Sequence, residues 1–96
     1  MLHTVNASPY ASSALANCLR YSEKHSEILL LEDAVVAGIL GGQWEGQLIS
    51  SGRRIYVLQE DAIARGIEQK IVSQFELIDM EGFVELTARH VTQMKW

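Results

Sequence analysis

The sequence predicts an α/β fold, with a mostly parallel sheet flanked by helices on both faces, in a single domain that spans residues 1–96. Runs with strand composition alternate along the chain with segments of helical periodicity, which is typical of parallel sheets. One run, residues 28–31, is apolar at every position, as expected for a strand covered on both faces. A length of 96 residues fits one small domain.

Five segments are expected to form the strands, at residues 2–5, 27–31, 54–58, 75–79 and 91–96. The run 54–58 is rich in the β-branched and aromatic residues that favour strands. A turn rich in Asn, Ser and Pro at 6–10 ends the first strand. Residues 43–52 fit neither the strand period nor the helix period.

Four helices are expected between these strands, at about residues 12–24, 33–40, 61–65 and 80–90. Ser12 or Ser13 is expected to cap the first helix and Asp33 the second, because short polar side chains accept hydrogen bonds from the free N–H groups of a helix start. Gly41-Gly42 is expected to end the second helix and Gly66 the third, since glycine readily takes the left-handed conformation found there.

The charged residues exclude some classes of function. The formal net charge is −4, and the eight Lys and Arg residues are scattered, with Arg53-Arg54 as the only adjacent basic pair. Direct nucleic-acid binding is not expected, because it needs a clustered basic surface. No apolar stretch approaches the roughly 20 residues of a membrane span, and no signal peptide is evident. A cytoplasmic protein is therefore predicted, with no membrane association.

The apolar content is high for so short a chain. Hydrophobic residues make up 48% of the sequence, yet a small domain offers little interior in which to bury them. Part of the apolar surface is therefore expected to lie against another chain.

Acidic residues follow three of the expected strands, at Glu32-Asp33, Glu60-Asp61 and Asp79. The carboxyl ends of parallel strands share one edge of the sheet, where ligands usually bind. Converging carboxylates there would bind a hard cation such as Mg²⁺ and support a stand-alone metal-dependent enzyme. The alternative is helix capping, which uses the same residues to accept hydrogen bonds from free N–H groups. We favour capping and expect no metal site.

The loop at residues 8–13 precedes a helix start, where an anion could bind. It has neither the glycine-rich dinucleotide fingerprint nor the lysine of a phosphate-binding loop. An ordinary turn and cap is therefore preferred to a flavin or nucleotide site, and no cofactor is expected.

Cys18 is the only cysteine and the only candidate nucleophile besides hydroxyl groups. Nucleophilic chemistry at a cysteine needs an accessible thiolate whose pKa is lowered by a cation or a helix N-terminus. Cys18 instead falls in mid-helix on an apolar stripe, where a thiol behaves as a small hydrophobic group. Packing is the preferred interpretation, and a catalytic role for Cys18 stays open.

The histidines and tryptophans form no recognised motif. His3, His25 and His90 lack the spacing of a metal site, and for His3 packing or a structural hydrogen bond is preferred to catalysis. Trp44 and Trp96 are large apolar groups that either complete the core of this chain or dock a partner, since aromatic residues are enriched in both places.

Several segments, in order along the chain, resemble the DsrH/TusB family of bacterial sulfur-relay subunits. The matching segments are Met1-Leu2-His3-Thr4 with Ser8-Pro9, Leu29-Leu30-Leu31-Glu32-Asp33, Val57-Leu58 with Glu60-Asp61-Ala62-Ile63-Ala64-Arg65-Gly66, Leu77-Ile78-Asp79 with Phe83, and His90 with Gln93-Met94-Lys95-Trp96. Each piece alone is weak, but the ordered set spans nearly the whole chain.

The resemblance implies a DsrE/DsrF-like fold and a dimer of heterotrimers with two sister subunits of the TusC/TusD or DsrF/DsrE type. Such complexes accept persulfide sulfur on a cysteine and pass it to downstream sulfur-carrier proteins. In the family the main persulfide cysteine belongs to a sister subunit, at the start of the short helix after the third strand. Here that place reads Gln59-Glu60-Asp61. The resemblance therefore implies a mainly structural, non-catalytic subunit of a sulfurtransferase complex.

Two branches of the family differ in where the sulfur goes. TusB-type complexes serve 2-thiolation of the wobble uridine of tRNA, and DsrH-type complexes serve dissimilatory sulfur oxidation. DsrH-type members can carry a cysteine in a context like Cys18-Leu19-Arg20, which would make Cys18 an auxiliary sulfur acceptor. The ending Gln93-Met94-Lys95-Trp96 looks more TusB-like, and on this basis we favour tRNA thiolation.

Overall fold

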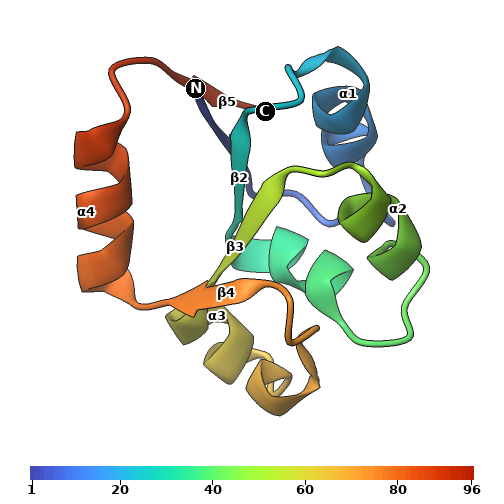
Figure 1. The fold of residues 1–96 in the computed structure, drawn as a ribbon. Coiled ribbons are helices and arrows are strands. Elements are labelled where there is room, and N and C mark those ends of the chain that lie inside the picture. Colours follow the sequence, from blue (N-terminus) through green and yellow to red (C-terminus); the bar gives the residue numbers. More distant parts are fainter.

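Five parallel strands form one sheet in the order β4-β3-β2-β1-β5 in the computed structural model, which describes residues 1–96 (Figure 1). The strands are β1 (Leu2–Val5), β2 (Glu27–Leu30), β3 (Arg54–Leu58), β4 (Glu76–Ile78) and β5 (Gln93–Lys95). Every neighbouring pair of strands is parallel. The predicted α/β class and all five predicted strands are confirmed.

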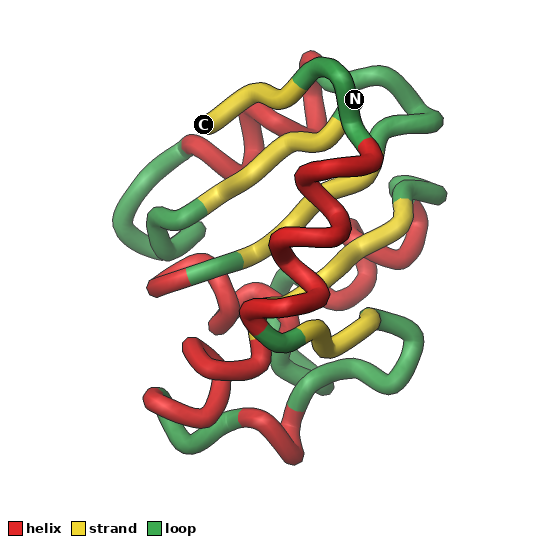
Figure 2. Tube along the Cα trace, turned by 90° about the vertical axis from the view of Figure 1, so that its left-hand side faces the viewer, coloured by secondary structure: helices red, strands yellow, loops and turns green.

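Helices cover both faces of this sheet, as predicted. They are α1 (Ala14–Tyr21), α2 (Glu45–Ser50), α3 (Gln59–Ala64), α4 (Met80–Arg89) and the 3₁₀ helices η1 (Glu32–Gly38) and η2 (Glu68–Lys70). Figure 2 shows α4 lying across the strands on one face, whereas α1 and α2 lie on the opposite side in Figure 1. The two faces are therefore covered very unequally.

The unequal cover divides the interior into two cores. Successive side chains of a strand point to opposite faces, so Ile28 and Leu30 join the larger core beneath α1, η1, α2 and α3, while Leu29 faces α4. The larger core contains 15 buried residues. The smaller one contains four, namely Leu2, Leu29, Tyr56 and Leu86. The apolar run of β2 is thus explained by burial on both faces, as predicted.

The first helix is shorter than its periodicity suggests. It ends at Tyr21 rather than at Lys24, with Ser22 in extended conformation as its C-cap. At its start Ser13 occupies the N-cap position without a side-chain hydrogen bond. The hydroxyl Oγ of Ser12 instead accepts a hydrogen bond from the amide N of Ala14, at 3.1 Å. Of the two predicted caps, Ser12 is the one whose side chain accepts a hydrogen bond from a backbone amide of the helix start.

The second helix differs from its prediction in type and in its first residue. It is the 3₁₀ helix η1, and Asp33 lies inside it rather than at its N-cap. The preceding residue, Glu32, takes a positive φ of 51°, an uncommon conformation for a residue with a side chain. Residues 43–52, which fit neither period, contain the short helix α2.

Arg53 joins the end of α1 to the start of β3. Its Nη2 atom donates to the carbonyl oxygens of Ser22 at 2.6 Å and Leu19 at 3.2 Å, and its Nε donates to that of Glu23 at 3.2 Å. The last carbonyl groups of a helix have no partner within the helix and carry partial negative charge. The Arg53 guanidinium satisfies them, and this contact coincides with the early end of α1.

Candidate functional site

Three of the acidic residues predicted at the carboxyl edge of the sheet, Glu60, Asp61 and Asp79, cap helices that start there. Asp79 caps its own helix α4, because its Oδ1 accepts from the amide N of Gly82 at 2.8 Å. Glu60 reaches across to the same helix, and its Oε2 accepts from the amide N of Met80 at 2.9 Å. Glu60 lies in α3, so it caps a neighbouring helix rather than its own.

Asp61 also caps a neighbouring helix, the one that follows β2 on the other side of β3. Its Oδ2 accepts from the amide N of Glu32, the first residue of η1, at 2.6 Å. The Arg65 guanidinium lies 2.7 Å from Asp33 and 3.9 Å from Asp61, and holds these two carboxylates together. The predicted capping role is correct in kind, but Glu60 and Asp61 cap the helices that follow the two neighbouring strands.

These contacts do not produce a metal centre. Asp61, Glu60 and Asp79 each accept a hydrogen bond from a different amide, and Arg65 supplies positive charge beside Asp33. No group of three or more His, Cys, Asp or Glu side chains comes close enough to hold a cation. The alternative of a metal-dependent enzyme required the three acidic ends to converge, and they do not.

Neutral substitution of these carboxylates tests the capping role. For Glu60→Gln and Asp61→Asn we expect the free energy of unfolding to fall by about 1 kcal/mol or less each, since an amide oxygen still accepts the hydrogen bond. Urea unfolding of each variant measures the change. A loss in either variant well above about 1 kcal/mol would show that the carboxylate does more than accept one amide hydrogen bond.

The loop at residues 8–13 uses its hydroxyl groups on its own backbone. Oγ of Ser8 accepts from the amide N of Tyr10 at 3.2 Å, and Oγ of Ser12 accepts from Ala14. The carbonyl oxygen of Ser8 also accepts from the amides of Ala11 and Ser12, at 3.1 and 3.0 Å. These contacts are those of an ordinary turn and helix start, the interpretation favoured from the sequence.

Cys18 lies in the larger core. It is 0% exposed and belongs to the buried cluster that includes Leu15 and Leu48. Burial raises the pKa of the thiol to about 11, and the opposing influences of the Ser22 hydroxyl and the Arg53 guanidinium do not offset it. The start of α3 carries Gln59-Glu60-Asp61. The only thiol is thus buried, and no thiol lies at the carboxyl edge.

Two of the three histidines make specific polar contacts. His3 is 3% exposed, and its ring nitrogens lie 2.9 Å from Nε1 of Trp96 and 3.2 Å from Oγ of Ser26. The structural hydrogen bond predicted for His3 is therefore present, and Trp96 packs on its own chain. Trp44 also packs, partly buried, against the larger core. His25 is exposed.

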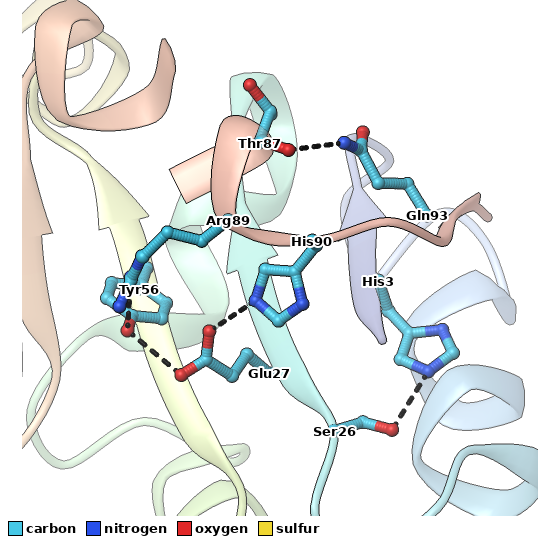
Figure 3. A network of polar contacts seen from close by, with 8 residues as sticks. All are labelled: His3, Ser26, Glu27, Tyr56, Thr87, Arg89, His90 and Gln93. Atoms are coloured by element: carbon cyan, nitrogen blue, oxygen red, sulfur yellow. Dashed lines mark hydrogen bonds and ion pairs between the residues drawn. The ribbon is translucent and has the colours of Figure 1, made fainter. Parts of the chain in front are cut away.

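His90 belongs to a network that the sequence analysis did not find (Figure 3). Its Nε2 lies 2.6 Å from Oε1 of Glu27, while the hydroxyl of Tyr56 donates to Oε2 of Glu27 at 3.1 Å and accepts from Arg89 at 3.4 Å. The network links the end of α4 to β2 and β3. The one signal in the sequence that could have indicated it is Glu27, a charged residue directly before the apolar run 28–31.

The environment of Glu27 has two opposing influences on its pKa. Burial alone raises it, but the hydrogen bonds from His90 and Tyr56, with the positive charges of His90 and Arg89, bring the pKa below its ordinary value. A carboxyl group whose pKa is lowered by folding stabilises the fold when ionised. This stabilisation is complete above about pH 4.5, the ordinary value, and is lost as the pH falls through the lower pKa of the folded state.

An acid titration of stability tests this network. Glu27→Gln is expected to lower the free energy of unfolding by about 1–2 kcal/mol at pH 7, because a charge-assisted hydrogen bond is weakened. The difference in the free energy of unfolding between the wild-type chain and the variant should shrink as the pH falls below about 4.5. Glu27 is protonated there first in the unfolded chain and, at lower pH, in the folded chain. Urea unfolding at several pH values between 7 and 3 measures it. A difference independent of pH would contradict a role for the ionised carboxylate.

The fold and the carboxyl edge together define a small α/β protein with a five-stranded parallel sheet, whose only thiol is buried and whose Glu60, Asp61 and Asp79 cap helices. No helix is long and apolar enough to span a membrane. A family model described as DsrH like protein matches residues 7–93. Protein TusB of Escherichia coli K12 is 40% identical over 96 residues, and that of Pectobacterium parmentieri is 38% identical, each alignment covering both chains completely. The chain belongs to the DsrH/TusB family.

A solved structure independently supports the fold. The crystal structure of the ychN protein from E. coli superposes with a TM-score of 0.81 and covers 99% of this chain and 97% of that one. The sequences are 21% identical, so the likeness bears on the fold alone. The expectations of family and fold class drawn from the sequence are both confirmed.

Proposed function

We propose that this chain is a structural, non-catalytic subunit of a cytoplasmic sulfurtransferase complex that passes persulfide sulfur toward 2-thiolation of the tRNA wobble uridine. Membership of the DsrH/TusB family and full-length similarity to proteins named TusB support this branch. The burial of Cys18, the only thiol, is the observation that separates a structural subunit from a sulfur-carrying one.

The chemistry of persulfide transfer explains why this burial matters. A thiolate must reach the incoming sulfur atom and later present it to the next acceptor. With a pKa of about 11, only about one Cys18 in 10,000 is a thiolate at pH 7, and none of its surface contacts solvent. Glu60 and Asp61 cannot carry a persulfide. The relay cysteine is therefore supplied by a sister subunit.

The same observation bears on the sulfur-oxidation alternative. That function would use Cys18 as an auxiliary sulfur acceptor, which requires an accessible thiol. A side chain with 0% exposure and a raised pKa does not favour such a role. We therefore place the chain in the thiolation branch, as a single domain assembled with TusC-type and TusD-type sisters in a dimer of heterotrimers, which delivers sulfur to downstream carrier proteins.

The surface offers apolar area for such partners. Large hydrophobic side chains remain exposed on several elements, among them Tyr10, Tyr21, Leu40, Val84 and Val91. Contiguous exposed apolar surface usually marks an interface. On the face covered by α4 alone, Met80 and Val84 are about half exposed, at 49% and 60%. This distribution agrees with a chain that completes its burial in a complex.

Assembly is the first testable consequence. We expect the isolated chain to self-associate or precipitate at micromolar concentration, and a stable complex to form when its two sister subunits are co-expressed with it. Sedimentation of the chain alone and native mass spectrometry of the co-expressed proteins measure the two states. A soluble monomer that binds neither sister subunit would count against this part of the proposal.

The function itself is tested in cells. Deletion of the gene is expected to reduce 2-thiouridine in tRNA to background, as measured by mass spectrometry of nucleosides. Expression of the wild-type chain or of Cys18→Ala should restore it equally, because the thiol is not used. Unchanged 2-thiouridine after deletion would refute the proposal, and failure of Cys18→Ala alone would return Cys18 to the relay.

A further inference from the structure

The last residue of the chain is bonded to the first strand through a buried histidine. Nε1 of Trp96 donates to Nδ1 of His3 at 2.9 Å, and the two ring centroids lie 5.9 Å apart. The other ring nitrogen of His3, Nε2, lies 3.2 Å from Oγ of Ser26; Figure 3 shows this contact. Three side chains thus form one chain of hydrogen bonds: Trp96 directly after β5, His3 in β1, and Ser26 directly before β2.

This geometry fixes the protonation state of His3. An indole N–H can only donate, so Nδ1 of His3 must present its lone pair to Trp96. The proton of the neutral ring is then on Nε2, where it is donated to the hydroxyl of Ser26. Protonation of His3 would add a hydrogen to Nδ1, directly opposite the N–H of Trp96. The bond between the two rings exists only while His3 is neutral.

The C-terminal strand β5 lies at the edge of the sheet and pairs with β1 alone. All three residues of β5 are exposed. At its two ends the amide N of Trp96 donates to the carbonyl of Thr4 at 2.9 Å, and that of Leu2 donates to the carbonyl of Thr92 at 3.2 Å. Trp96 is the one side chain from residues 91–96 that packs against the larger core. The packing of Trp96 therefore contributes strongly to holding β5 on the sheet.

The surroundings of His3 disfavour its charged form. Burial lowers the pKa of His3, and the N-terminal ammonium of Met1 and the Arg53 guanidinium lower it further, whereas Glu23 acts in the opposite direction. Tyr21 and Ser26 also line the cavity of about 240 Å³ beside the pair. The cavity reaches both rings, so water can approach them without separation of the central strands.

We infer that the His3–Trp96 hydrogen bond is a proton-controlled latch on β5, closed when His3 is neutral and open when His3 is protonated. Opening releases Trp96 and exposes the outer edge of β1. A histidine whose pKa is lowered in the closed state stabilises that state above its ordinary value of 6.5, and this advantage is lost as the pH falls below 6.5. This property of the fold goes beyond the proposed function and does not depend on it.

The test uses hydrogen exchange of the full-length chain followed by NMR at pH 7.5 and pH 5.5. Each amide is compared with its intrinsic rate at the same pH. The amides of Trp96 and Leu2 report on β5, and that of Leu31, which donates to the carbonyl of Val5, reports on the β1–β2 side. The ratio of protonated to neutral His3 in the open state rises from about 0.1 to about 10 across this interval. Protection of Trp96 and Leu2 is therefore expected to fall by up to about tenfold, with Leu31 unchanged.

Two variants isolate the titration of His3. His3→Gln keeps an acceptor for Trp96 and a donor for Ser26 but does not titrate, so its protection factors should not change with pH. Gln93→Ala is the matched control, because it removes another β5 contact, the hydrogen bond from Nε2 of Gln93 to the carbonyl of Thr87 at 2.9 Å. It should lower protection by the same factor at both pH values.

Direct observation of the ring keeps the inference testable if His3→Gln does not fold. The ¹⁵N shifts of His3 in the wild-type chain at pH 7.5 should show Nε2 protonated and Nδ1 free. A ring protonated at Nδ1 at pH 7.5 would overturn the latch. So would loss of protection at Leu31 equal to that at Trp96, or a pH dependence that survives in His3→Gln.

Discussion

Replacing Arg53 with alanine is expected to lower the free energy of unfolding by about 2–4 kcal/mol, because three carbonyl groups lose a charged donor together. The guanidinium bonds to the carbonyl oxygens of Leu19, Ser22 and Glu23 at 2.6–3.2 Å, and two of these contacts are partly buried. Without the side chain, the end of α1 keeps unpaired acceptors beside β3. Urea unfolding followed by circular dichroism measures the loss.

The neighbouring arginine provides a matched control. Arg54 is 63% exposed and pairs with Glu76 at 3.7 Å, so Arg54→Ala should change stability by no more than about 0.5 kcal/mol, as is usual for surface pairs. Arg53→Lys keeps the charge but not the planar group that reaches three carbonyls, and should recover only part of the loss. Equal effects of Arg53→Ala and Arg54→Ala would show that the carbonyl contacts contribute nothing specific.

The elements that were predicted well are those with local causes. The apolar run 28–31 identified a strand buried on both faces because its residues alternate between the two cores. Gly66, at a φ of 68°, ends the short helix after β3 by its own conformational freedom. Asp79 caps α4 from the adjacent position. In each case the residues that decide the structure are neighbours in sequence.

The errors have long-range causes. The periodicity of α1 extends to Lys24, but the helix ends at Tyr21, beside the carbonyl groups held by Arg53, which lies about thirty residues further along the chain. Asp33 was expected to cap a helix, yet its carboxylate pairs with Arg65 from another element, 32 residues away. No local pattern encodes which distant side chain will reach a helix end.

In the candidate site, too, features with local causes were predicted and long-range contacts were not. The sequence predicted which acidic residues lie at the carboxyl edge, because strand ends and parallel topology determine that placement. It did not predict that Glu60 accepts from Met80, a residue separated from it by 20 positions. The network of Glu27 with His90 spans 63 positions, and the pair of His3 with Trp96 spans 93. Such contacts follow from strand order, which the sequence does not state.

Sulfur loading of the assembled complex is expected to leave Cys18 unmodified. A persulfide donor should add sulfur to the relay cysteine of a sister subunit, while Cys18, 0% exposed and with a pKa of about 11, stays a free thiol. Intact-mass analysis of each subunit after loading measures this. Loading in denaturant is the control, because Cys18 should react there once the core is opened.

Substitution of Cys18 separates packing from chemistry. Cys18→Ala removes a small apolar group and should cost roughly 1 kcal/mol, whereas Cys18→Ser buries a hydroxyl and should cost about 2–3 kcal/mol. Both complexes are expected to transfer sulfur at the wild-type rate below their unfolding temperatures, since the proposed function routes no step through this thiol. The order of stability, wild type above alanine above serine, is that of a buried apolar site. A sulfur atom found on Cys18 in the folded complex, or transfer lost in a folded Cys18→Ser complex, would place Cys18 in the relay and overturn the structural role proposed for this subunit.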